Sequence, residues 1–215
     1  MQAIVLLSGG QDSATCLAIA ADQADTVHCI CFDYGQRHRI EMECSQALAT
    51  LAGASFQVVD VTFLGALTSS AMIHSEVPIT DLDNGWPSTF VPGRNALFLT
   101  IAGTIAYERG AGVIYTGVCQ TDYSGYPDCR EAFIQSQEQT LQLALDAHIL
   151  IKAPLMHLTK AQTVLAMQQY GHLAWYRHTH TCYNGQRPAC GTCPSCVLRK
   201  KGFLDAGILD PLDYN

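Results

Sequence analysis

Short apolar runs alternate along most of the chain with stretches whose apolar residues recur at helical spacing. We expect strands at Ala3–Leu7, Val27–Phe32, Phe56–Val61, Val113–Gly117 and His148–Lys152. We expect helices at Ser13–Ala21, Glu41–Leu51, Asn95–Glu108, Arg130–Ala147 and Lys160–Tyr170. Strands that are apolar on both faces and separated by helices are typical of right-handed βαβ units. The pattern therefore predicts an α/β, Rossmann-like fold with a parallel sheet flanked by helices.

Two segments break this alternation. Thr62–Pro92 is rich in proline and polar residues, and an irregular stretch of that length inside a domain is usually functional or mobile. Arg177–Gly202 is crowded with cysteines, which indicates a small lobe held together by a metal ion. We therefore divide the chain into a larger domain, residues 1–176, and a metal-binding C-terminal lobe, residues 177–215, packed on it.

Charge narrows the choice of partners. The chain has 12 Lys and Arg against 19 Asp and Glu, a net charge of -7. A protein that coats a nucleic acid backbone needs the opposite balance, so we expect a small-molecule substrate and no nucleic acid partner. No window reaches the roughly 18 apolar residues of a membrane span, and the first residues lack the basic start of a signal peptide. We expect a cytoplasmic protein that does not contact a membrane.

Disulfides are rare in the reducing cytoplasm where we expect this protein, so we do not interpret its ten cysteines as a disulfide framework. Four of them, Cys182, Cys190, Cys193 and Cys196, lie within fifteen residues. Thiolates at this spacing match a tetrahedral zinc ion, one per chain, whose closed ligand set makes it structural. An iron–sulfur cluster is the rival, because two of the short spacings also begin the bacterial ferredoxin run. No further cysteine closely follows Cys196, which favours zinc.

The segment Ser8–Ser13 lies between the first strand and the first helix. Glycines there let backbone N–H groups approach a phosphate, and the helix N-terminus attracts anions. A plain turn with a capped helix is the alternative. The spacing fits neither a Walker A loop nor a dinucleotide-binding G-x-G-x-x-G motif.

These six residues resemble the S-G-G-x-D-S signature of the PP-loop ATP pyrophosphatases. The resemblance implies a loop that grips the pyrophosphate of ATP while an acceptor attacks the α-phosphorus. Asp12 would organise Mg²⁺, and Lys160 would reach the phosphates. Asp33 ends the second strand, about where a nucleotide fold places its ribose-binding acid. The ATP-binding set is then Leu7, Ser8, Gly9, Gly10, Gln11, Asp12, Ser13, Ala14, Thr15, Cys16, Leu17 and Asp33.

Two further runs, Phe90–Asn95 and Gly117–Arg130, gather polar and aromatic residues in loops. The second follows a strand, and ligands of a parallel sheet bind at the carboxyl ends of its strands. Its residues could stack on and hydrogen-bond a planar heterocycle. We take as substrate candidates Asp122, Tyr126, Asp128 and Arg130.

Together with Phe32–His38, Pro154–Met156 and the cysteine cluster, these runs make nearly the whole chain resemble the 7-cyano-7-deazaguanine synthase family of queuosine biosynthesis. The resemblance implies an ATP-dependent ligase, acting as a homodimer. It would convert 7-carboxy-7-deazaguanine and free ammonium into a nitrile through an adenylated acid and an amide.

The resemblance also assigns roles. Asp12, Lys160 and Arg94 are the expected catalytic residues. Asp122 or Asp128 would accept the N–H donors of the deazaguanine edge, while Arg94 or Arg130 would orient the carboxylate or neutralise phosphate.

Two alternatives remain. A PP-loop tRNA sulfurtransferase also adenylates its target, but it needs a basic tRNA-binding surface and a reactive thiol pair. A zinc-ribbon module that binds nucleic acid is supported only by a few cations near the cluster, Arg187, Arg199, Lys200 and Lys201.

Overall fold

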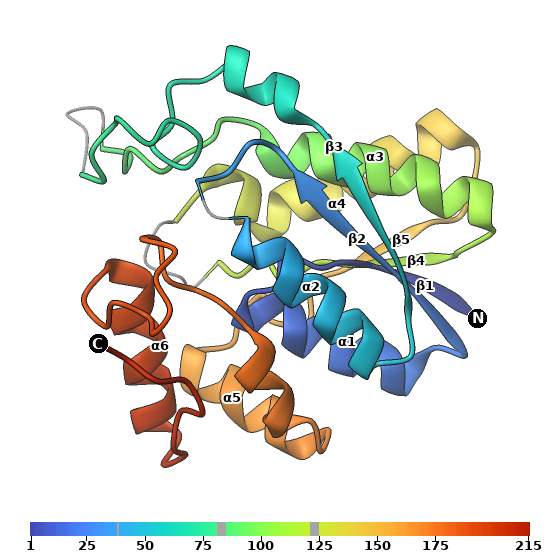
Figure 1. Cartoon of the computed structure of the whole chain (residues 1–215). Helices are drawn as coiled ribbons and strands as arrows, with labels where there is room; N and C mark the ends of the chain where they lie inside the picture. Colours follow the sequence, from blue (N-terminus) through green and yellow to red (C-terminus); the bar gives the residue numbers. More distant parts are fainter. Residues whose placement is uncertain (38, 81–84, 121–124) are drawn as a thin grey trace.

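The computed structural model describes residues 1–37, 39–80, 85–120 and 125–215. Its five strands form one parallel sheet in the order β3-β2-β1-β4-β5 (Figure 1). Their bounds are β1 Gln2–Leu6, β2 Thr26–Asp33, β3 Ser55–Asp60, β4 Val113–Tyr115 and β5 Leu150–Lys152. In the centre, Val5 pairs with Cys29 on one side and Tyr115 on the other. The predicted fold class is confirmed.

The strand order creates a crevice at one edge of the sheet. The chain leaves β1 toward β2 and β3, then crosses to β4 and β5 on the other side of β1. The connections after β1 and β4 therefore run in opposite directions. Open parallel sheets bind ligands at the carboxyl ends of such a pair of strands.

Helices cover both faces of the sheet (Figure 1). Their bounds are α1 Gln11–Gln23, α2 Ile40–Leu51, α3 Arg94–Arg109, α4 Glu131–Leu145, α5 Lys160–Gln169 and α6 Pro194–Asp205. Alternate residues of β1 separate two cores: Val5 packs with α1, α2, α5 and α6, whereas Ile4 packs with α3 and α4. No helix within the described residues is long and apolar enough to cross a membrane.

Helix α6 is the element that the hydrophobic pattern did not predict. Its buried positions recur at helical spacing but are occupied by Cys196, Arg199, Gly202 and Phe203, so they do not form an apolar stripe. Arg199 is only 2% exposed and donates from Nε to Asp210 at 2.9 Å. The helix is therefore held by Phe203 in the apolar core, by the polar contacts of Arg199 and by its close packing on α5.

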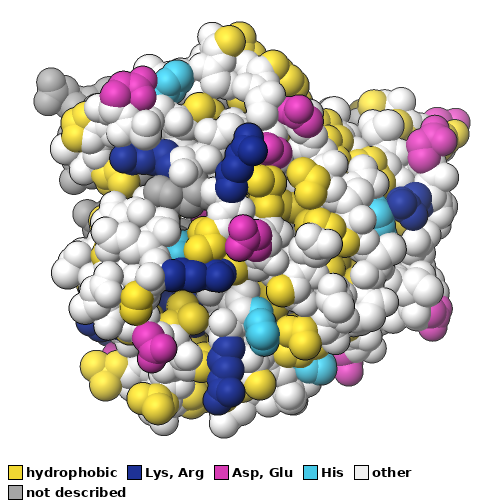
Figure 2. All heavy atoms as spheres, in the orientation of Figure 1, with side chains coloured by type: hydrophobic (Ala, Val, Ile, Leu, Met, Phe, Trp, Pro, Cys, Tyr) yellow, Lys and Arg dark blue, Asp and Glu magenta, His cyan; other side chains and the backbone are white. Residues whose placement is uncertain are grey.

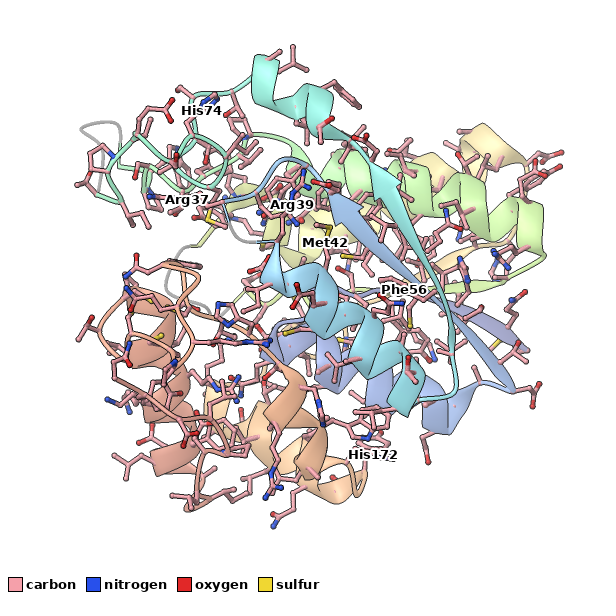
Figure 3. All side chains as sticks on the ribbon, in the orientation of Figure 1. Arg37, Arg39, Met42, Phe56, His74 and His172 are labelled. Atoms are coloured by element: carbon pink, nitrogen blue, oxygen red, sulfur yellow. The ribbon has the colours of Figure 1, made fainter. Side chains whose placement is uncertain are left out.

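The Thr62–Pro92 segment begins with a short 3₁₀ helix and continues in turns where it is described. It is fastened to the loop after β2, where Arg37 donates to the carbonyl oxygen of Ser75 at 3.0 Å. His74, on the same segment, bonds through Nε2 to the carbonyl of Thr68 at 2.8 Å. Figure 3 shows Arg37 and His74 on the same side of the molecule, beyond the end of β2. This segment faces the C-terminal lobe across that side.

Candidate active site

The glycine loop between β1 and α1 is packed too tightly for larger residues. Gly9 has a φ of +81°, and a Cβ there would lie 2.3 Å from the carbonyl oxygen of Glu41. Gly117, just after β4, approaches the backbone of Asp12 so closely that a Cβ would be 3.1 Å from its carbonyl carbon. The Ser8 hydroxyl donates to Ser13 Oγ at 3.1 Å. The loop therefore holds its backbone at the crevice between β1 and β4.

Asp12 and Lys160 meet beside this loop. Lys160 Nζ donates to Asp12 Oδ2 at 2.6 Å, and both side chains are mostly buried. Lys160 is the first residue of α5, whose start is fixed by a capping box between Thr159 and Gln162. The structure thus brings together two residues expected to be catalytic that are 148 positions apart in the chain.

Two polar atoms at this point have no hydrogen-bond partner among the described residues: Asp12 Oδ1 and Gln11 Nε2. Gln11 is 3% exposed. Leaving a buried polar atom unpaired costs about 1–3 kcal/mol, so such atoms mark places where a ligand completes the bonding. A carboxylate oxygen suits a divalent cation and an amide N–H suits an anion, which together fit a magnesium-bound phosphate.

Two cavities open around the Asp12–Lys160 pair. The first, about 310 Å³, lies at the carboxyl ends of the strands and is lined by the glycine loop, Ile30, Phe32 and Gly117. The second, about 300 Å³, lies between the Thr62–Pro92 segment and the C-terminal lobe, with Lys160 in its wall. The residues that line both are Gln11, Asp12, Thr89, Tyr126, Thr181, Tyr183 and Ser195.

The first cavity is also lined by Arg94 and by Glu41, and Glu41 was not among the predicted site residues. Burial raises the pKa of the Glu41 carboxyl from 4.5 to about 7, although Arg94 opposes the shift. Arg94 lies over the Tyr34 ring, 5.6 Å from its centroid. Burial lowers the pKa of Arg94, but Tyr34 and Asp128 outweigh it and leave that pKa raised. The sequence signal for Glu41 was its place in the first turn after the Phe32–His38 run.

The other predicted residues divide into two groups. Tyr126 lines both cavities, and its hydroxyl lies 2.8 Å from Thr89 Oγ1. Asp128 and Arg130 line neither: Asp128 accepts from the backbone N–H of Asn95 at 3.1 Å, and Arg130 donates to the Gly125 carbonyl at 3.3 Å. Asp122 lies outside the described residues.

Within the predicted ATP-binding set, most residues of the loop line the first cavity, but five residues outside the loop line neither cavity. Asp33 turns its carboxylate to the backbone N–H of Gly35 at 3.1 Å and lines neither cavity. The residues of α1 that follow the loop, Ala14, Thr15, Cys16 and Leu17, are fully buried in the helix and support the loop from behind.

The four predicted metal ligands converge in the C-terminal lobe. The Sγ atoms of Cys182, Cys190, Cys193 and Cys196 all lie within 4.8 Å of one another. Bonds of about 2.3 Å to a tetrahedral ion would separate the sulfurs by about 3.8 Å, and Cys190 and Cys196 are 3.9 Å apart. The geometry and the soft donor set therefore fit a tetrahedral metal ion.

The C-terminal lobe is bonded directly to the glycine loop. The backbone N–H of His180, two residues before the first metal ligand, donates to the carbonyl of Gly9 at 2.9 Å. A second link joins the lobe to α2, where the Arg187 guanidinium donates to Cys44 Sγ at 2.9 Å. The lobe therefore contacts the glycine loop and lines both cavities of the candidate site.

Comparisons with known proteins agree with this architecture. The family model described as queuosine biosynthesis protein QueC matches residues 2–207. The chain is 49% identical to the 7-cyano-7-deazaguanine synthase of Chromobacterium violaceum, over 98% of this chain and 92% of that protein.

Two solved structures share the fold. A 4-thiouridine synthetase in complex with RNA and ATP has a TM-score of 0.54 at 17% identity, covering 96% of this chain and 50% of that one. A predicted subunit of a tRNA methyltransferase from Methanocaldococcus jannaschii has a TM-score of 0.51 at 19% identity, covering 77% and 74%.

Proposed function

The chain belongs to the QueC family of queuosine biosynthesis proteins, and from that premise we propose that it makes 7-cyano-7-deazaguanine from 7-carboxy-7-deazaguanine, ammonia and ATP. The observation that carries this proposal is the Asp12–Lys160 pair beside the glycine loop. Next to it, Gln11 Nε2 and Asp12 Oδ1 are buried and have no hydrogen-bond partner among the described residues. These atoms lie where the two cavities meet.

The chemistry requires activation of the acid, because a carboxylate has no usable leaving group at neutral pH. A carboxylate oxygen of the acid attacks the α-phosphorus of ATP, and pyrophosphate leaves. The loop N–H groups, Gln11 and Lys160 bind the phosphates and stabilise the developing charge. Mg²⁺ bound at Asp12 would neutralise part of the phosphate charge. No side chain has to act as a covalent nucleophile.

Ammonia then attacks the acyl carbon, and AMP leaves with one oxygen of the acid to give the amide. The amide oxygen attacks a second ATP in the same way. Loss of AMP from this adenylate, with release of protons from nitrogen, forms the nitrile. Each oxygen of the original acid therefore leaves on a molecule of AMP, so the atoms balance.

For the C-terminal lobe we propose a structural zinc ion bound by the four cysteines. A closed set of four thiolates leaves no position for water or substrate. Cys182 and Cys196 are almost fully buried, which supports a role in holding the lobe together. The homodimer stays a prediction.

The sulfurtransferase alternative is not favoured. The family match and the synthase relative both point to queuosine biosynthesis. On the face shown in Figure 2, the Lys and Arg side chains are scattered among acidic residues and do not gather into one basic surface.

The test is mass spectrometry of the reaction of metal-loaded protein with the acid, ATP, Mg²⁺ and ammonium. We expect the nitrile, with release of AMP and pyrophosphate. ADP and phosphate would retain the substrate but contradict adenylation. Absence of turnover by folded protein would refute the proposed function.

A further inference from the structure

The second cavity has walls from two segments that lie outside the alternating βα core. Ile79, Thr80 and Pro87 come from the Thr62–Pro92 segment, whereas Ser195 and Leu198 come from α6. Figure 1 shows these two segments facing each other beyond the carboxyl ends of β1 and β2. The cavity therefore exists only because the C-terminal lobe is placed opposite that segment.

The two cavities differ in how much of the glycine loop lines them. Ser8, Gly10 and Ser13 of the glycine loop line the first cavity and are absent from the walls of the second. Only Gln11 and Asp12 of the loop reach the second cavity. A nucleotide whose phosphates lie on the loop therefore belongs in the first cavity, with its phosphates at the shared border.

The walls of the second cavity suit a flat, polar heterocycle. Tyr126 stacks on Phe90 with ring centroids 5.1 Å apart, and Phe90 packs on Trp86 at 5.4 Å, so the tyrosine ring is firmly supported. Leu198 adds an apolar surface, and the Thr80 and Ser195 side chains add hydrogen-bonding groups. About 300 Å³ is at the lower end of the range for small-molecule pockets.

The charge in the second cavity lies at one end. Lys160 is in the wall at the border with the loop, beside the unpaired amide N–H of Gln11. Arg199 also contributes to the wall, but Asp210 accepts two hydrogen bonds from its guanidinium. Lys160 is itself paired with Asp12 at 2.6 Å, so an anionic group is favoured at the Lys160 end when Mg²⁺ neutralises Asp12, next to the place where the nucleotide phosphates would lie.

We propose that the second cavity is the binding site of the acid substrate, with the heterocycle against Tyr126 and Leu198 and the carboxylate directed to Lys160. This inference rests on the proposed function. It places the carboxylate at the border between the cavities, from which it can reach the α-phosphorus of ATP. It also makes the metal-held lobe responsible for substrate selection.

The test compares two tryptophan substitutions at adjacent positions of α6. Leu198→Trp fills the second cavity, whereas Val197→Trp adds the same side chain at a position that is 53% exposed and lines neither cavity. Val118→Trp is the reciprocal variant, because Val118 lines only the first cavity. For each protein, calorimetry measures the binding of ATP alone, and the binding of the acid in the presence of a non-hydrolysable ATP analogue. Steady-state kinetics then gives the KM for ATP and the KM for the acid.

We expect Leu198→Trp to weaken acid binding at least about tenfold and to leave ATP binding unchanged, as overpacking of a pocket predicts. Val197→Trp should match the parent, and Val118→Trp should weaken ATP binding. If Leu198→Trp does not fold, Leu198→Ala gives the measurement, since it enlarges the cavity and should also raise the KM of the acid alone.

Equal acid binding by the Leu198 and Val197 variants would refute the assignment of the second cavity. The proposed function would still stand in that case, provided that the parent protein converts the acid. Weakened ATP binding in Leu198→Trp would refute it as well. A parent protein that neither binds nor converts the acid would instead refute both.

Discussion

At the scale of single residues, the most informative contact is the one between Lys160 and Asp12. The lysine places a positive charge against a mostly buried carboxylate whose other oxygen is unpaired among the described residues. Charge placed in advance where phosphate charge develops is usually a large part of catalysis, because it needs no reorganisation during the reaction.

Replacing Lys160 with Met should therefore lower kcat/KM for the acid by about 100-fold or more. Lys201→Met is the matched control, because Lys201 forms an exposed ion pair with Asp205 in α6 and lines neither cavity. Steady-state kinetics with both variants checks this expectation. Similar activities in the two variants would show that Lys160 does not act on the phosphates.

Glu41 gives a prediction about pH. Its carboxyl keeps its proton in the folded protein up to about pH 7, whereas the unfolded chain releases it near pH 4.5. The folded state therefore binds more protons in this window, and the stability from Glu41 is present at low pH and lost as the pH rises through 7. As the pH rises from about 5 to about 8, the free energy of unfolding of Glu41→Gln should increase relative to that of the parent, by at most about 3 kcal/mol. Denaturant unfolding at both pH values measures the difference, and a difference that does not vary with pH would contradict the placement of Glu41.

At the scale of elements, the turn from β1 to α1 depends on a single glycine. Gly9→Ala should reduce the free energy of unfolding by about 3 kcal/mol or more, because a left-handed backbone is combined with a clash against α2. Gly110→Ala, at the end of α3, shares the positive φ but meets no atom within 4 Å, so about 1–2 kcal/mol is expected. Denaturant unfolding of both variants measures this contrast. Equal losses would mean that the loop tolerates a side chain at Gly9.

The elements of the core could be predicted from sequence because their burial is apolar and periodic. The predicted strands match the observed strands within a few residues, and α4 ends before the predicted Ala147 because Asp146 adopts a left-handed conformation. Helix α6 was not predictable in this way, since its buried face holds Arg199 and a metal ligand. Its order depends on tertiary contacts and on the metal site, which a periodicity argument does not include.

In the candidate site too, some residues could be predicted from local sequence, whereas others depend on tertiary contacts. Contiguous motifs were the better guide: most residues of the glycine loop line the first cavity, and the four cysteines of the cluster converge on one another. Single residues inside a polar loop were harder to assign. Asp128 bonds to the N-terminus of α3, and Glu41 reaches the first cavity from a helix, both through contacts that sequence spacing does not encode.

At the scale of the whole molecule, the C-terminal lobe is joined to the rest of the chain at the candidate site. The hydrogen bond from His180 to Gly9 links the segment before the cysteine cluster to the glycine loop. Removal of the metal by a chelator should disorder the lobe, lower the melting temperature and weaken ATP binding about tenfold. Calorimetry and thermal melting before and after zinc is added back measure these effects. Unchanged ATP affinity in metal-free protein with a disordered lobe would show that the two parts act independently.

The measurement that tests the account most directly follows the oxygen atoms of the acid. The substrate is prepared with both carboxylate oxygens replaced by a heavy isotope, and the products are weighed by mass spectrometry after turnover with ATP and ammonium. Attack on the α-phosphorus in both rounds predicts heavy oxygen in AMP, two molecules of AMP for each nitrile, and none in pyrophosphate. Heavy oxygen in inorganic phosphate together with ADP would contradict adenylation, and with it the role given to the glycine loop, Asp12 and Lys160.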